Sequence, residues 1–163
     1  MNKDKIFRPI VNLESDTAKT TTGALNNLLA NEYALFTKTL NYHWNITGPR
    51  FHSLHTFLEG QYKDLLTVMD DIAERIRIIG ETPHSTVKKL AGAMDLSERN
   101  GAGLSSNEMI NDLFESNMII QEEIKDITKK EELFKEDPGT EDFLVGLLQK
   151  HEMMSWMLKS HLD

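Results

Sequence analysis

Apolar residues recur along most of this chain with the spacing of an α-helix rather than that of a β-strand. Between about residues 20 and 46 they form one stripe, on which His43 comes next: Leu25, Leu28, Leu29, Phe36 and Leu40. Further helical segments run from about residue 50 to 80, from about 105 to 133, and from about 140 to the end. No segment alternates apolar and polar residues as a strand would, so we expect an all-α protein.

Glycine and proline separate these helical segments and mark the turns: Gly48-Pro49, residues 80–83, residues 101–103 and Pro138-Gly139. Four long helices, joined by tight turns and one longer crossover between the second and the third, are typical of a four-helix bundle.

Helix-capping residues refine these boundaries. Ser105 and Glu108 have the spacing of a capping box at the start of the third long helix. Ser85 and Thr86 are suited to cap a short extra helix in the crossover, from about residue 87 to 94. We expect residues 1–16 to form an N-terminal tail and residues 17–163 to form the bundle.

Composition narrows the class of protein. A chain of 163 residues with 39% hydrophobic residues is long enough for one domain with a sizeable core. It contains no cysteine, which excludes disulfides and thiolate metal sites. The net charge of −8 opposes binding to nucleic-acid backbones. Neither a secretory signal nor a membrane-spanning stretch is visible, so we expect a cytoplasmic protein with no membrane partner.

Four side chains that can bind metal share one face of the second helix. With His55 at 0° on the helical wheel, Glu59 lies at about 40°, Asp70 at about 60° and Glu74 at about 100°. Such a face can also be an ordinary solvated acidic surface. Asp70 and Glu74, however, are a like-charge i,i+4 pair, which is destabilising unless a cation lies between them. The neighbouring Asp71 and Arg75 have the spacing of an ordinary i,i+4 ion pair.

His43 joins this set from the first helix. It precedes the turn at Gly48-Pro49 by about as many residues as His55 follows it, so an antiparallel hairpin places both at one level. Alone, His43 could be a core histidine with a satisfied ring. Together with His55 and Glu59, it offers the nitrogen and carboxylate ligands that suit Fe, Zn or Mn.

One chain cannot bring all five side chains together. His55 and Asp70 are separated by 15 residues of one helix, or about 22 Å. An antiparallel two-fold pairing of this helix with its copy, about an axis near Asp64 and Leu65, would place His55 and Glu59 of one chain opposite Asp70 and Glu74 of the other. The spacing therefore predicts two equivalent metal sites, each shared across a dimer.

A metal site inside the bundle is not expected. Bundles that bind two irons in their interior carry Glu-x-x-His on two helices. The only such motif here, from Glu81 to His84, includes Pro83 and falls in a predicted loop.

Residues 41–86 carry a resemblance to a known family. They contain His-Trp-Asn, Gly-x-x-Phe, His-x-x-x-Glu and Asp-x-x-Ala-Glu-Arg, at spacings similar to those of the Dps family of mini-ferritins. The helical layout extends this likeness over about residues 17–163. The resemblance implies a ferritin-like four-helix bundle, a dodecameric hollow shell, and a ferroxidase that oxidises Fe(II), preferably with hydrogen peroxide, and stores the ferric mineral.

The resemblance also implies roles for single residues. The family's inter-subunit iron ligands correspond to His43, His55 and Glu59 of one chain and to Asp70 and Glu74 of its two-fold mate. The family often has Asp where this chain has Glu59, which lengthens the ligand by one methylene. Trp44 corresponds to a tryptophan that is thought to quench oxidising equivalents, although a core or interface aromatic would fit the position equally well.

Two other properties of the family have weaker support in this sequence. Acidic residues near the turn into the fourth helix correspond to a region that lines iron-entry pores in the family: Glu131, Glu132, Glu136, Asp137, Glu141 and Asp142. DNA binding usually accompanies a basic tail, and here the tail offers Lys3, Lys5 and Arg8. We expect DNA binding to be weak at most, with any nucleoid association following from it.

Two alternatives to an iron-storing ferroxidase stay open. One is a nucleoid-binding structural protein whose metal site is vestigial. The other is a helical interaction module with structural histidines.

Overall fold

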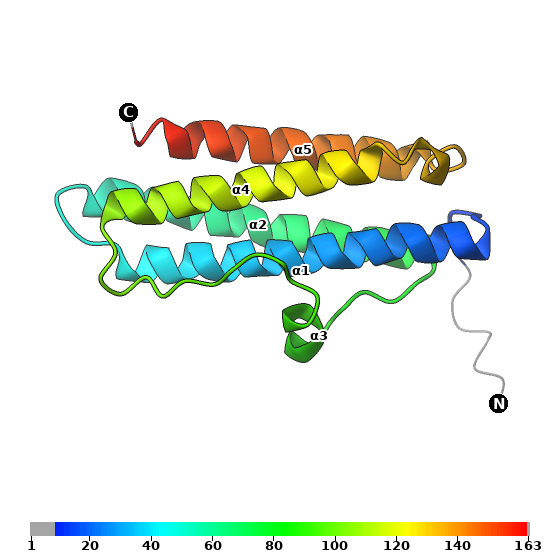
Figure 1. The fold of residues 1–163 in the computed structure, drawn as a ribbon, viewed down its shortest axis with the longest axis horizontal. Coiled ribbons are helices and arrows are strands. Elements are labelled where there is room, and N and C mark those ends of the chain that lie inside the picture. Colours follow the sequence, from blue (N-terminus) through cyan, green and yellow to red (C-terminus); the bar gives the residue numbers. More distant parts are fainter. Residues whose placement is uncertain (1–8, 163) are drawn as a thin grey trace.

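A computed structural model describes residues 9–162, which are built entirely from helices, turns and loops. Four long helices lie side by side, and a short one lies outside them (Figure 1). Their bounds are α1 Ser15–Asn45, α2 Phe51–Ile79, α3 Val87–Ala91, α4 Ser106–Thr128 and α5 Pro138–Lys159, with a 3-10 helix, η2, at Glu131–Leu133. The all-α bundle with a short helix in the crossover is confirmed.

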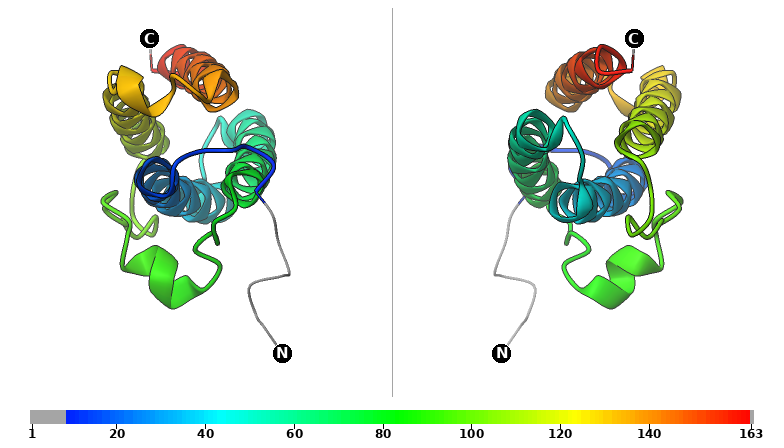
Figure 2. Two further views of the ribbon diagram at one scale, coloured as in Figure 1. Left: turned by 90° about the vertical axis from the view of Figure 1, so that its right-hand side faces the viewer. Right: turned by 90° about the vertical axis from the view of Figure 1, so that its left-hand side faces the viewer.

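The helices pack as two antiparallel hairpins. α1 packs most extensively on α2, and α4 on α5, as the end-on views show (Figure 2). Because α2 and α4 run in the same direction, the crossover between them must travel the length of the bundle, and it carries α3 along one side (Figure 1).

Local chemistry explains where most helices begin and end. The Ser105 side chain accepts from the backbone of Glu108, whose carboxylate accepts in return from the Ser105 N–H, so the predicted capping box is present. The Thr86 side chain caps α3. α2 ends at Gly80, whose φ of 108° is the left-handed conformation that glycine adopts without steric cost.

Four helix boundaries differ from those predicted. α3 ends at Ala91 rather than near residue 94, and α5 ends at Lys159 rather than at the end of the chain. α1 begins at Ser15 rather than near residue 20, and α4 ends at Thr128 rather than near residue 133. After α4 the chain turns so that Leu133 and Phe134 are buried in the core, which a continued straight helix would not allow. Residues 1–8 of the predicted tail lie outside the described residues, and the domain division at residue 16 stays a prediction.

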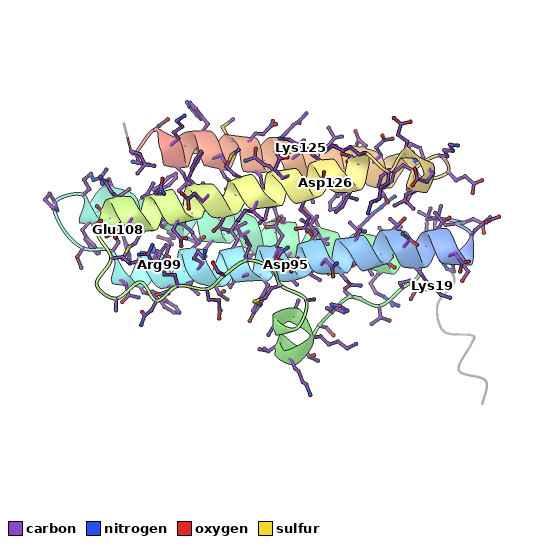
Figure 3. The ribbon with its side chains drawn as sticks, viewed as in Figure 1. Lys19, Asp95, Arg99, Glu108, Lys125 and Asp126 are labelled. Carbon is purple, nitrogen blue, oxygen red and sulfur yellow. The ribbon has the colours of Figure 1, made fainter. Side chains whose placement is uncertain are left out.

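Asparagine side chains of α1 hold the crossover against the bundle. The Asn31 carbonyl accepts from the Asp95 N–H at 2.7 Å and from the Leu96 N–H at 3.2 Å. Its amide donates to the Glu123 carboxylate at 2.7 Å, which links the crossover to α4. Asn41 donates to the Arg99 carbonyl further along; Figure 3 labels Asp95 and Arg99 on this stretch. The crossover is thereby tied along α1.

The core is apolar, with a chain of polar groups in its interior. The inner stripe of α2 is fully buried: Leu54, Leu58, Leu65, Val68, Ile72 and Ile76. Between α1, α4 and α5, the buried His151 Nε2 contacts Glu32 Oε1 at 2.7 Å, and its Nδ1 contacts Asn117 Oδ1 at 2.8 Å. Lys38 of α1 pairs with Asp112 of α4 at 3.2 Å. These buried polar contacts fix α1 relative to α4 and α5.

Candidate metal centre

The two predicted histidine ligands meet where the first hairpin turns. His43 lies in the last turn of α1 and His55 near the start of α2, and their rings stack with centroids 3.7 Å apart. His43 is buried, whereas His55 is half-buried. The antiparallel hairpin therefore brings the rings together, and one edge of the pair stays accessible.

Each histidine is oriented by the backbone of the other helix. His43 Nδ1 lies 2.8 Å from the His55 carbonyl oxygen, and His55 Nδ1 lies 2.8 Å from the His43 carbonyl oxygen. A carbonyl oxygen can only accept, so we assign the proton of each neutral ring to Nδ1. The lone pair is then on Nε2, which is the arrangement that metal-binding histidines commonly show.

Aromatic side chains surround the inner side of this pair. Tyr62 stands edge-on to His43, with ring centroids 5.2 Å apart, and Phe36 packs against Tyr62 at 6.2 Å. Phe51 lies 4.9 Å from His55. The packing limits rotation of the imidazoles, so each ring is held in one orientation within the single chain.

Glu59 lies one turn after His55 and forms an ion pair within its own helix. Its carboxylate is in direct contact with the ammonium of Lys63, one turn further on. The hydrogen bond and charge of Lys63 lower the pKa of Glu59, and the nearby His43 and His55 act in the same direction. Sequence reasoning missed Lys63, although Glu followed by Lys at i,i+4 is a favourable helical pair.

Asp70 and Glu74 lie on the same outer face of α2 but at its other end, and both are exposed. Fifteen residues separate His55 from Asp70, so the chain does not bring the carboxylates to the histidines. Within residues 9–162, no group of three or more His, Asp or Glu side chains is arranged to hold a metal ion. A single chain thus presents two separate parts of the predicted ligand set.

The two parts are related by position along α2. The midpoint between His55 and Glu74 coincides with the midpoint between Glu59 and Asp70, and both fall between Asp64 and Leu65. Next to this midpoint, on the same outer face, the side chain of Leu66 is 47% exposed.

Trp44 directly follows His43 and is 68% exposed in the single chain. It is therefore not a core aromatic of this chain. A part in an interface and a part in redox protection both stay predictions.

The expected ion pair between Asp71 and Arg75 is wrong. Arg75 instead reaches the start of α5, where it pairs with Asp137 and donates to Thr140 Oγ1 at 2.7 Å. Asp71 lies 3.9 Å from Lys150 of α5. Tertiary contacts with α5 therefore replace the local pairing that the i,i+4 spacing predicted.

The acidic residues predicted to cluster near the start of α5 have different environments in the structure. Asp137 is only 2% exposed, and its carboxylate caps α5 by accepting from the Thr140 N–H. Asp137 therefore has a structural role. The other acidic residues, Glu131, Glu132, Glu136, Glu141 and Asp142, are exposed or half-buried.

In the bundle interior, the described residues bring a buried histidine, His151, against a buried glutamate, Glu32. His151 and Glu32 are both inaccessible to solvent, and Glu32 Oε2 has no hydrogen-bond partner among the described residues. The Glu81-to-His84 segment lies in a loop, as its proline predicted. Sequence reasoning gave His151 no role; its only signal was its place on the apolar stripe of the last helix.

Within the described part of the chain, no helix combines the length and apolar character needed to cross a bilayer.

Comparisons with known proteins point to one family. Residues 22–163 match the family Ferritin, described as ferritin-like domain. The chain is 35% identical to a low temperature-induced protein of Nostoc sp. over 85% of this chain and 78% of that one. It is 33% identical to DNA protection during starvation protein 2 of Bacillus anthracis, over 85% and 94% of the two chains.

The solved structures agree. The crystal structure of a Dps protein from Vibrio cholerae, described as a member of a broad superfamily of ferritin-like diiron-carboxylate proteins, superposes with a TM-score of 0.88. It is 28% identical in sequence, and the match covers 99% of this chain and 100% of that one.

Proposed function

The chain belongs to the Dps family of ferritin-like proteins, and from this premise we propose that it is a ferroxidase and iron store. Fe(II) is its substrate, hydrogen peroxide its preferred oxidant, and the ferric product is kept inside a hollow shell. The shell is a homo-oligomer, with twelve subunits as the family resemblance implies, and it works in the cytoplasm.

The observation that carries this proposal is the orientation of His43 and His55. Their Nδ1 atoms lie 2.8 Å from backbone carbonyl oxygens of the other helix, which leaves the Nε2 atoms of the two stacked rings available to a ligand, and His55 lies one helical turn before Glu59. Structural histidines in a core would use both ring nitrogens, as His151 does. A nitrogen and oxygen set of this kind suits Fe(II).

We propose that Asp70 and Glu74 of the partner chain complete the site. A two-fold axis crossing α2 between Asp64 and Leu65 places Glu59 opposite the partner's Asp70, and His55 opposite the partner's Glu74. The exposed Leu66 then lies close to the axis and is covered. The coincident midpoints of both residue pairs support a symmetric, isologous contact of this kind.

The ligand set explains the chemistry. Five or fewer protein ligands leave open positions on the metal for water and peroxide. Each of two Fe(II) ions gives one electron, so hydrogen peroxide is reduced to two hydroxide ions without release of a hydroxyl radical. Neutral imidazoles are required for binding, so protons compete with the metal. We also propose that Trp44, the neighbour of His43 in sequence, donates an electron when peroxide is bound and fewer than two Fe(II) ions are present to reduce it.

The test is an anaerobic titration with Fe(II), followed by hydrogen peroxide, on the assembled protein. We expect rapid oxidation, two Fe(II) consumed per peroxide, and a large shell by light scattering. His43→Ala and His55→Ala should each slow oxidation at least tenfold, as is common when a metal ligand or its supporting group is lost. Oxidation at the parental rate in both variants would contradict the proposed site.

A nucleoid-binding structural protein is the alternative that the names of several relatives favour. The predicted basic tail residues Lys3, Lys5 and Arg8 lie outside the described residues, and the net charge of −8 per chain opposes binding. An assembly that shifts DNA on a gel at physiological salt and takes up no iron would establish this alternative. A monomer or dimer with neither activity would indicate an interaction module.

A further inference from the structure

The carboxylate of Glu59 already has a cation of its own. In the single chain it contacts the ammonium of Lys63, which leans back along α2 by one turn. Side chains of a helix point toward its N-terminus, so this direction is the one that the backbone favours. The predicted ligand therefore holds a positive charge before any metal ion arrives.

The other cations of α2, Arg75 and Arg77, lie at the far end of the helix, more than four turns after Glu59. Arg75 pairs with Asp137 at the start of α5. Arg77 donates to the Glu81 carbonyl oxygen at 2.8 Å, beyond the end of the helix. Lys63 lies on the face that carries His55, Glu59 and Asp70, at about 80° on the same helical wheel, and it contacts the Glu59 carboxylate directly.

The two-fold pairing places Lys63 among several carboxylates. Its ammonium lies beside Glu59. In the proposed pairing, Glu59 of one chain lies directly opposite the partner's Asp70. The partner's Glu74 lies about one turn away. Three carboxylates and two neutral imidazoles carry a charge of −3, and the ammonium of Lys63 reduces it to −2, which one divalent ion balances.

On the basis of the proposed shared site, we propose that Lys63 is a resident cation of that site, which neutralises Glu59 until metal binds and lowers the affinity of the site for divalent ions. It is a specificity-determining residue of the iron reaction rather than a ligand. The first metal ion must displace the ammonium from Glu59. A second metal ion is then repelled by the ammonium of Lys63 as well as by the first ion, which makes its binding weaker than the ligands alone would allow.

The experiment measures Co(II) binding, by calorimetry and visible absorption, to the metal-free assembled protein at low salt. The variants are Lys63→Met, which keeps the length of the side chain without its charge, and Lys63→Arg, which keeps the charge. Lys125→Met is the matched control, because Lys125 forms an exposed pair with Glu122 on α4 (Figure 3). Lys63→Gln serves as a second neutral variant if Lys63→Met does not assemble.

We expect Lys63→Met to bind Co(II) about fivefold more tightly than the parent. Lys63→Arg should restore the parental affinity, and Lys125→Met should not differ from the parent. The difference should shrink as salt is added, since the interaction is between charges. In chelator, the melting temperature of Lys63→Met should fall because the carboxylates lose their counter-charge.

Unchanged or weaker Co(II) binding by the neutral variants would overturn the role of Lys63 and leave the shared site standing. A fivefold gain that Lys63→Arg also shows would overturn it too, because the gain would then not follow the charge. A parent that binds no Co(II), or a His55→Ala variant that binds it as the parent does, would overturn the proposed function, and the role of Lys63 with it.

Discussion

At the scale of single residues, the site depends on groups that the backbone holds in place. His43 and His55 exchange Nδ1–H···O=C contacts across the turn, so neither ring can rotate without losing a hydrogen bond. Asp70 and Glu74, in contrast, are exposed on the outer face of α2. The histidine part of the proposed site is thus already oriented in the single chain, whereas its carboxylate part is exposed.

Replacing Asp70 by Asn should separate stability from activity. Asp70 and Glu74 repel each other at i,i+4, which costs a few tenths of a kcal/mol, and the ammonium of Lys63 offsets only one of the three carboxylate charges that the proposed site gathers. Asp70→Asn should therefore raise the melting temperature of the metal-free assembly while it abolishes fast iron oxidation, because an amide is a poor metal ligand. Melts in chelator and stopped-flow oxidation measure both effects. A lower melting temperature with parental oxidation would mean that Asp70 is structural.

Glu123 offers a test of pH dependence. Burial raises the pKa of this carboxyl, the Asn31 amide opposes the shift, and the charges of Glu32 and Asp95 reinforce it. Because the pKa of Glu123 is higher in the folded state than in the unfolded state, ionisation of this carboxyl lowers the free energy of unfolding. The cost is absent below the ordinary pKa near 4.5, where both states are protonated, and complete above the raised folded-state pKa.

Glu123→Gln should therefore raise the melting temperature at pH 7.5, and this gain should vanish near pH 4. The glutamine oxygen can still accept the Asn31 hydrogen bond. Glu122→Gln, an exposed neighbour that pairs with Lys125, is the control and should show no such gain. A stabilisation of equal size at both pH values would contradict the assignment of the effect to ionisation.

At the scale of the helices, the start of α5 is joined to α2 by one buried pair. Arg75 of α2 reaches Asp137 and Thr140, and Gly139 makes room for it: a Cβ at Gly139 would lie 3.0 Å from Arg75 Nη2. Asp137 also caps α5. Two helices that otherwise contact each other little are thereby kept in register beside Glu74.

Arg75→Leu should destabilise the fold by about 3 kcal/mol, because it leaves the carboxylate of Asp137 buried without a cation. For a chain of this size, that is a fall of about 6–12 °C in melting temperature. Lys150→Met, which removes the exposed 3.9 Å pair with Asp71, is the control and should change stability by less than about 1 kcal/mol. If Arg75→Leu melts like the control, Asp137 does not depend on the guanidinium.

At the scale of the whole molecule, one chain carries the two parts of the proposed ligand set at opposite ends of α2. An isologous dimer would join these parts in two sites at once, so activity should belong to the assembly and not to the folded chain. The exposed Leu66 and Trp44 are then expected to be covered in the assembly. This arrangement distinguishes the proposed site from one in the bundle interior, where His151 and Glu32 already bind each other.

Mixed assemblies test this arrangement. His55→Ala and Asp70→Ala chains should each be inactive alone and should regain part of the activity when they are refolded together. A mixed dimer places both lesions in one of its two sites and leaves the other intact, so random mixing should restore about a quarter of the parental sites. Activity no higher than that of either variant alone would refute ligation across the dimer.

The sequence by itself determined the helices and their order. The 3.6-residue period of apolar residues predicts the buried stripe of α2. Gly48-Pro49, Gly80 and Pro138 predict the turns between the helices. Both signals are readable from the sequence because helix periodicity and turn formation depend on residues that are close together in the chain. The same local reasoning placed His43 and His55 at one level. Helix ends were less well determined: α1 begins five residues early, since nothing local stops the helix at Thr20.

Only the tertiary structure decided which polar groups bind one another. Arg75 pairs with Asp137, 62 residues away, rather than with Asp71, and His151 binds Glu32, 119 residues away. The tautomers of His43 and His55 likewise depend on carbonyl groups across a turn. A charged or polar side chain on a helix has several possible partners, both within its own helix and on neighbouring helices. Once water is excluded, each buried polar group needs a hydrogen-bond partner, so the packing of the helices decides which contact forms.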